Sequence, residues 1–91
     1  MGHISADKDR IIARVRRIAG QVAAVERAVA ADAPCGETLH LVAAVRGAVA
    51  GLMDEIAEEH LRTHVAADDL TPEQRQQGAD ELAAVLRRHF R

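Results

Sequence analysis

The chain has 91 residues and a formal net charge of −2 at pH 7, which allows one small domain, 1–91, with no overall excess of positive charge. Hydrophobic residues make up 48% of it, but Phe90 is the only aromatic residue, and small aliphatic cores often depend on association with other copies or on a bound metal. The single cysteine, Cys35, excludes an internal disulfide, and no apolar run is long enough to span a membrane, so we expect a cytoplasmic homo-oligomer without membrane association.

The first predicted element is a long helix that begins after Ser5 or Asp7, either of which is a plausible N-cap. Pro34 disfavours helical geometry at Ala33, so the helix should end near that point. Its apolar residues follow heptad spacing over most of this length. They are Ile11, Val15, Ile18, Val22, Val25 and Val29.

The same segment is basic, with six basic and three acidic residues among the first 27. A basic helix can be an electrostatic footprint for nucleic acid, or it can be an ordinary solvated helix face. At about 100° per residue, three arginines cluster beside the apolar stripe and three further basic residues spread around the helix. The cluster is Arg10, Arg14 and Arg17, and the others are Lys8, Arg16 and Arg27.

A second helix is predicted from about residue 36 to about residue 66. Apolar residues cover more than one side of its first two-thirds, as in a helix that several neighbours bury. One partner in a hairpin is too little cover for such a helix, which again indicates an oligomer. Near its end, His60 and His64 are four residues apart and lie on one face of the helix.

A third, shorter helix is predicted to begin in the segment "LTPEQ". Thr71 is a good N-cap, Pro72 suits the first helical position, and Gln74 completes a capping box. Gly78 lies inside this helix and should cost about 1 kcal/mol relative to alanine. The apolar stripe of the helix is Leu82, Val85, Leu86 and Phe90. No strand pattern is present, so the expected fold is all-α.

The histidine pair could bind one metal ion, or it could simply extend a packing face. Cys35 and His60 lie about 25 residues apart on the second helix, which separates them by roughly 37 Å. Two copies of this helix packed antiparallel would bring the start of one beside the end of the other. His3 and the amino terminus would lie near the histidine pair of their own chain if the first two helices form an antiparallel hairpin. The hypothesis is a metal site shared between subunits, and it requires at least a dimer.

Four segments together resemble the CsoR/RcnR family of small bacterial repressors: "RVRRIAGQV", Cys35 after the turn, "AAVRGAVAGLM" and "EEHLRTH". The resemblance covers roughly residues 3 to 66. It implies a three-helix protomer, a dimer with antiparallel four-helix-bundle character, and a tetramer formed as a dimer of dimers. It also implies a protein that is not an enzyme, binds double-stranded operator DNA without a helix-turn-helix, and releases it when an inducer binds.

The sensing positions are most similar to those of the nickel/cobalt branch of this family. That branch carries His, Cys, His and His where this chain has His3, Cys35, His60 and His64, and its terminal amine is a further ligand. Gly2 would supply the amine if Met1 is removed. One thiolate with several nitrogens suits Ni(II) or Co(II) better than Cu(I). The resemblance therefore implies a repressor of metal efflux or resistance genes with Ni(II) or Co(II) as inducer.

Two alternatives remain open. The formaldehyde-sensing branch cross-links an amino-terminal proline to the cysteine that corresponds to Cys35 and has an acidic residue at position 64. "RVRRI" resembles that branch, whereas Gly2, His3 and His64 depart from it, although a primary amine at Gly2 could still condense with formaldehyde. The other alternative is a helical adaptor protein that uses its apolar second helix and senses nothing.

DNA binding would fall to the basic face of the first helix. By resemblance, Arg14 and Arg17 match basic positions that contact DNA, and Arg46 is a third such position for which a structural role is equally open. Arg10, Arg16 and Lys8 would add contacts to phosphates, which makes binding strongly dependent on salt. Replacing Arg14 with alanine is expected to abolish operator binding while metal affinity stays nearly intact.

Overall fold

The computed structural model describes residues 8–90 and contains three helices: α1 (Lys8–Ala30), α2 (Cys35–His64) and α3 (Pro72–His89). Residues 8–90 include no strand, and the all-α prediction is confirmed. Both ends of α2 lie within two residues of the expected ones, and α1 ends at Ala30, three residues before Ala33. The two candidate N-caps of the first helix, Ser5 and Asp7, lie outside the described residues.

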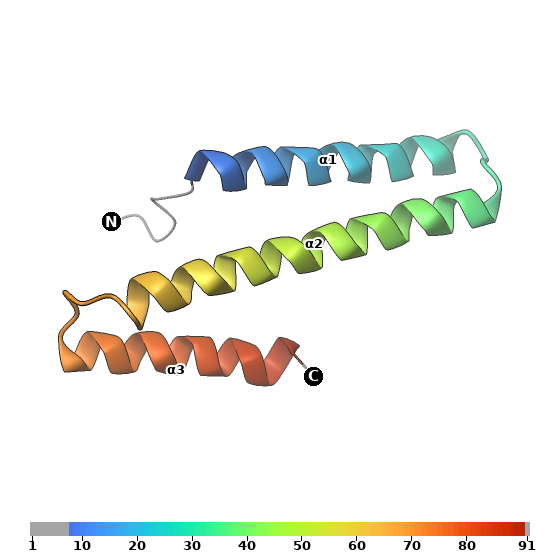
Figure 1. Cartoon of the computed structure of the whole chain (residues 1–91). Helices are drawn as coiled ribbons and strands as arrows, with labels where there is room; N and C mark the ends of the chain where they lie inside the picture. Colours follow the sequence, from blue (N-terminus) through green and yellow to red (C-terminus); the bar gives the residue numbers. More distant parts are fainter. Residues whose placement is uncertain (1–7, 91) are drawn as a thin grey trace. The chain divides into compact units, whose positions relative to one another are not determined.

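The described chain divides into two compact units, 8–53 and 54–90. In the first unit, α1 and the first part of α2 lie side by side and run in opposite directions (Figure 1). In the second unit, the last part of α2 and α3 form another antiparallel pair. Each unit is therefore a helical hairpin, and α2 contributes to both.

The turn between α1 and α2 ends the first helix with a residue in left-handed geometry. The N–H of Ala33 donates to the carbonyl of Ala28 at 2.9 Å, and the N–H of Asp32 donates to the carbonyl of Val29 at 3.1 Å. This pair of bonds is a Schellman motif, which favours glycine at the position that Asp32 occupies. Asp32 has a φ of 55° and is the only non-glycine residue with positive φ among residues 8–90.

Replacing Asp32 with glycine is expected to stabilise the protein by about 1 kcal/mol, because glycine adopts positive φ without a steric penalty. The change also removes a negative charge from the carboxyl end of a helix, where the dipole disfavours it. Urea unfolding followed by circular dichroism measures the gain. Asp32→Asn serves as the control, since it removes the charge and keeps a side chain. An Asp32→Gly protein no more stable than the original would contradict the role assigned to the turn.

The amino end of α3 carries the predicted capping box. The N–H of Gln74 donates to Thr71 Oγ1 at 3.1 Å, and the N–H of Thr71 donates to Gln74 Oε1 at 2.9 Å. Pro72 occupies the first helical position, as expected. The local sequence therefore determines where this helix begins.

The first unit buries little of its apolar stripe. Ile11 and Ile18 are 5% and 9% exposed, and they are the buried hydrophobic residues of the described chain. Val15, Val22 and Val29, at seven-residue intervals along α1, are 46%, 50% and 62% exposed. Further exposed large hydrophobic residues on α2 in this unit are Leu39, Val42 and Val49. A single copy thus leaves much of the heptad stripe in contact with water.

Within residues 8–90, none of the helices combines the length and the apolar composition that a membrane crossing requires.

Candidate functional site

The last turns of α2 hold the two histidines side by side. The ring centroids of His60 and His64 are 4.9 Å apart, and the ring planes are tilted by 42°. Both residues are half-buried. Two imidazoles at this separation on one helix face can each offer a nitrogen to the same divalent ion, since such ions bind imidazole nitrogen at about 2.0–2.1 Å.

A carbonyl of α3 determines which nitrogen of His60 carries the proton. His60 Nε2 lies 2.9 Å from the carbonyl oxygen of Gly78. A carbonyl oxygen only accepts hydrogen bonds, so Nε2 is the donor and the neutral ring keeps its lone pair on Nδ1. Glu81 Oε1 lies 3.8 Å from the same Nε2, which is too far for a hydrogen bond. Nδ1 is therefore the nitrogen of His60 that could accept a metal ion.

The packing of α3 against α2 explains why position 78 is a glycine, although glycine lowers the stability of the helix itself. It is the buried residue of α3. A Cβ built on it would meet the backbone carbonyl of His64, lying 2.7 Å from the carbonyl carbon and 2.9 Å from the His64 Cβ. Real Cβ atoms do not approach other atoms so closely, and backbone atoms do not yield as a flexible side chain does. Glycine is thus the residue that lets α3 lie against the histidine end of α2.

Arg75 of α3 contacts the segment that follows α2. Its guanidinium donates to the carbonyl of Val65, just beyond the last residue of the helix. The N–H groups of Val65 and Ala66 both donate to the carbonyl of Leu61. A positive charge at the carboxyl end of a helix is favourable because the helix dipole is negative there. Arg75 therefore holds the end of α2 beside α3.

Sequence reasoning missed these contacts from α3. Gly78 did carry a signal, because a glycine inside a helical pattern often marks a close approach of two backbones. Arg75 and Glu81 carried none, since charged residues on a short helix usually face solvent. Their role depends on how α3 lies against the end of α2.

Among the described residues, the predicted ligand Cys35 does not lie with the histidine pair of its own protomer. Cys35 is the first residue of α2 and is exposed, whereas the histidine pair lies near the last residue of the same helix. Among residues 8–90, no group of three or more His, Cys, Asp or Glu side chains is arranged to hold a metal ion. His3 and the amine of Gly2 lie outside the described residues. His40 and His89 are exposed, as expected for ordinary surface residues.

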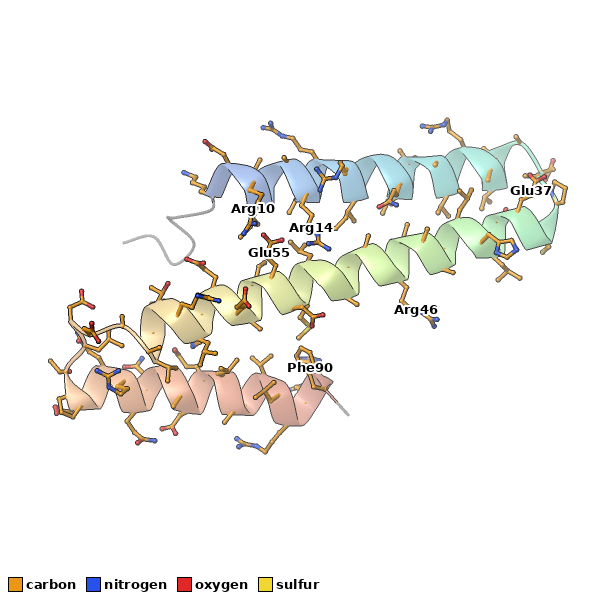
Figure 2. The ribbon with its side chains drawn as sticks, viewed as in Figure 1. Arg10, Arg14, Glu37, Arg46, Glu55 and Phe90 are labelled. Atoms are coloured by element: carbon orange, nitrogen blue, oxygen red, sulfur yellow. The ribbon has the colours of Figure 1, made fainter. Side chains whose placement is uncertain are left out.

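The predicted DNA-binding residues differ in their environments. Arg14 is half-buried, and its guanidinium lies against Gly51 of α2, where it would touch any added Cβ. Figure 2 shows Arg14 projecting from α1 toward α2, and Arg46 projecting from α2 on the side away from α1. Arg17 is exposed and lines a surface hollow together with Gln21. The other predicted residues are exposed: Lys8, Arg10, Arg16 and Arg46.

Comparison with known proteins identifies the family. Residues 7–88 match the family model described as a metal-sensitive transcriptional repressor. The chain is 47% identical over 91 residues to an uncharacterized protein in the bioA 5′ region of Serratia marcescens, with both chains covered completely. It is 36% identical over 88 residues to a transcriptional repressor RcnR homolog of Escherichia coli O139:H28, with 94% of each chain covered.

A solved structure supports the same assignment. It is a glutamate-to-histidine variant of the formaldehyde-responsive regulator FrmR of Salmonella enterica serovar Typhimurium. The two chains share 46% identity and superpose with a TM-score of 0.88, over 97% of this chain and 99% of that one. The match over nearly the whole length, together with the family model, favours a regulator over a helical adaptor. The chain therefore belongs to the CsoR/RcnR family of metal-sensitive transcriptional repressors, which are not enzymes.

Proposed function

We propose that this protein represses transcription by binding double-stranded operator DNA and releases that DNA when it binds Ni(II) or Co(II), which would derepress metal efflux or resistance genes. The single observation that carries the choice of inducer is the histidine pair, with ring centroids 4.9 Å apart. An orienting carbonyl on one ring is typical of a metal-ligating histidine. His64 also supplies a nitrogen at the position where the resemblance places an acidic residue in aldehyde sensors.

The full ligand set is proposed to come from two subunits. Cys35 of one copy would join His60 and His64 of another, together with His3 and the Gly2 amine if Met1 is removed. The exposed valines of α1 and the exposed apolar residues of α2 provide the surface on which copies would associate. The minimum assembly is a dimer, and the family resemblance favours a tetramer. The chain would act as one domain, because α2 runs through both compact units.

Coupling between inducer and DNA would run through the amino-terminal part of the chain. His3 precedes the helix that carries Arg10, Arg16 and Arg17, so a ligand that fixes His3 also fixes where that helix starts. Inducer binding across a subunit boundary would favour one arrangement of these helices over another. A coupling free energy of about 1–3 kcal/mol is usual for such a link, which corresponds to a change of roughly 5–150-fold in operator affinity.

Formaldehyde is the second candidate inducer, and a specific observation favours it. The FrmR variant, derived from a formaldehyde-responsive regulator, shares 46% identity with this chain, whereas the RcnR homolog shares 36%. The Gly2 amine would add to formaldehyde, and the Cys35 thiol would displace water from the adduct. The product would be a methylene bridge between nitrogen and sulfur, with one water released and no net oxidation. The retained His64 argues against this route, since the bridge has no use for a second imidazole.

One experiment separates the two inducers. The reduced protein is bound to its operator DNA, and Co(II) or formaldehyde is added while fluorescence anisotropy follows release and absorbance follows the metal. We expect Co(II) to produce a thiolate-to-metal charge-transfer band and to release the DNA at matching concentrations. Release by formaldehyde alone, with no thiolate band in Co(II), would overturn the metal assignment and establish the second candidate.

A further inference from the structure

The contact between Gly78 and the histidine end of α2 is the feature of the second unit that the sequence does not explain. Gly78 is buried, although most of α3 is exposed or half-buried. Its α-carbon lies against the His64 backbone, and its carbonyl accepts a hydrogen bond from His60 Nε2 at 2.9 Å. One residue of α3 thus touches both histidines.

We propose that Gly78 is a positioning residue for the inducer site: its missing side chain lets α3 approach the His64 backbone, and this approach fixes the orientation of the His60 ring before the inducer arrives. This proposal depends on the proposed function for one premise, namely that the histidines bind the inducer. The glycine lets α3 approach the His64 backbone, and that approach brings the Gly78 carbonyl within reach of His60. In this way α3, whose sequence is otherwise generic, helps to form the proposed inducer site at the end of α2.

A methyl group at position 78 would break this arrangement. It would come within van der Waals radii of the carbonyl oxygen, the carbonyl carbon and the Cβ of His64. The carbonyl group belongs to the backbone of α2 and cannot rotate away, so α3 would have to shift as a whole. The Gly78 carbonyl would move with it, and His60 would lose the acceptor that holds the proton on Nε2. The ring would then sample both tautomers and more than one orientation.

Histidine NMR of the metal-free protein tests the contact directly. Two-bond correlations between ring protons and ring nitrogens, recorded well above the titration range of free histidine, report the tautomer of each neutral ring. His60 is assigned by its absence in His60→Gln. We expect the Nε2–H tautomer in the wild-type protein and a mixture of tautomers in Gly78→Ala. The matched control is Gly20→Ala, because a Cβ at Gly20 meets nothing within 4 Å, and it should leave the His60 signals unchanged.

Metal affinity provides the second readout. Because supporting contacts around a metal ligand commonly change affinity by about 10–100-fold, Gly78→Ala should bind Co(II) at least tenfold more weakly than Gly20→Ala. An Nδ1–H tautomer of His60 in the wild-type protein would overturn the proposal. So would a Gly78→Ala protein with unchanged His60 signals and unchanged affinity.

Two further outcomes are also informative. If Gly78→Ala loses helical content by circular dichroism, the wild-type tautomer decides: Nε2–H supports the proposal and Nδ1–H refutes it. A wild-type protein that shows the Nε2–H tautomer and the expected change in Gly78→Ala, but does not bind Co(II), would refute the metal function while the positioning contact stands.

Discussion

Mixing Cys35→Ala protein with His64→Ala protein is expected to restore about a quarter of the Co(II) sites of the wild-type protein, although each variant alone should show no thiolate band. The reason is that a shared site takes its thiolate from one subunit and its imidazoles from the other. In a mixed dimer, one site combines the intact Cys35 of one copy with the intact His64 of its partner. The other site lacks both residues. Because half of the dimers in a random mixture are mixed, about a quarter of all sites are restored.

Refolding the two variants together from urea allows the subunits to exchange, and the charge-transfer absorbance of added Co(II) counts the restored sites. A mixture of His60→Ala with His64→Ala is the matched control. Both residues lie on the same end of the same helix, so every site in a mixed dimer keeps one defect and no band should return. His40→Ala, which alters an exposed histidine of α2, should keep the full band alone.

A site contained within one subunit predicts a different pattern. Mixing would then restore nothing in either pair, because no copy carries a complete set of ligands. Such a result would exclude the shared site while leaving the histidine pair as a candidate. Cys35→Ala protein that binds Co(II) with unchanged affinity would remove the thiolate from the site.

Replacing Arg17 with alanine is expected to weaken operator binding by about 100-fold or more, since every copy in the oligomer loses a phosphate contact. Arg17 is exposed beside a surface hollow, so the substitution leaves the packing of α1 intact. The slope of log affinity against log salt should become shallower by about one for each phosphate contact removed. Anisotropy titrations with labelled operator at several salt concentrations measure both quantities, and Co(II) affinity should not change.

Arg27→Ala is the matched control for this substitution, because it removes the same charge from an exposed residue in the last turn of the same helix. It should affect operator binding far less if Arg17 makes a direct contact, and equally if only the overall charge matters. Equal losses would therefore contradict a defined DNA-binding face on α1.

From the sequence alone, Arg14→Ala was expected to abolish operator binding and leave metal affinity nearly intact. The structure changes this expectation. Its guanidinium lies against Gly51 of α2, so Arg14→Ala removes an interhelical contact as well as a charge. We expect Arg14→Ala to weaken operator binding and also to lower the midpoint of thermal unfolding. Arg17→Ala should change operator binding alone, which makes it the clearer test of the DNA interface.

The sequence by itself determined the local features of this protein. The heptad spacing of α1, the proline after its end and the capping box at Thr71 act within a few residues of chain. The helices accordingly begin and end close to where they were predicted. The four-residue spacing of His60 and His64 placed them on one face of α2. The rise per residue of a helix excluded a site that joins Cys35 to this pair within one copy. The ligands proposed at His3 and Gly2 remain predictions from the sequence.

Only the tertiary structure decided what surrounds these residues. From the sequence, Gly78 was expected only to destabilise its helix by about 1 kcal/mol. In the structure, it is the residue at which α3 packs against the His64 backbone. The same approach places a carbonyl on His60 Nε2 and Arg75 on the carbonyl of Val65. Helical periodicity tells which residues share a face of one helix. It does not give the distance between two helices, and these contacts depend on that distance.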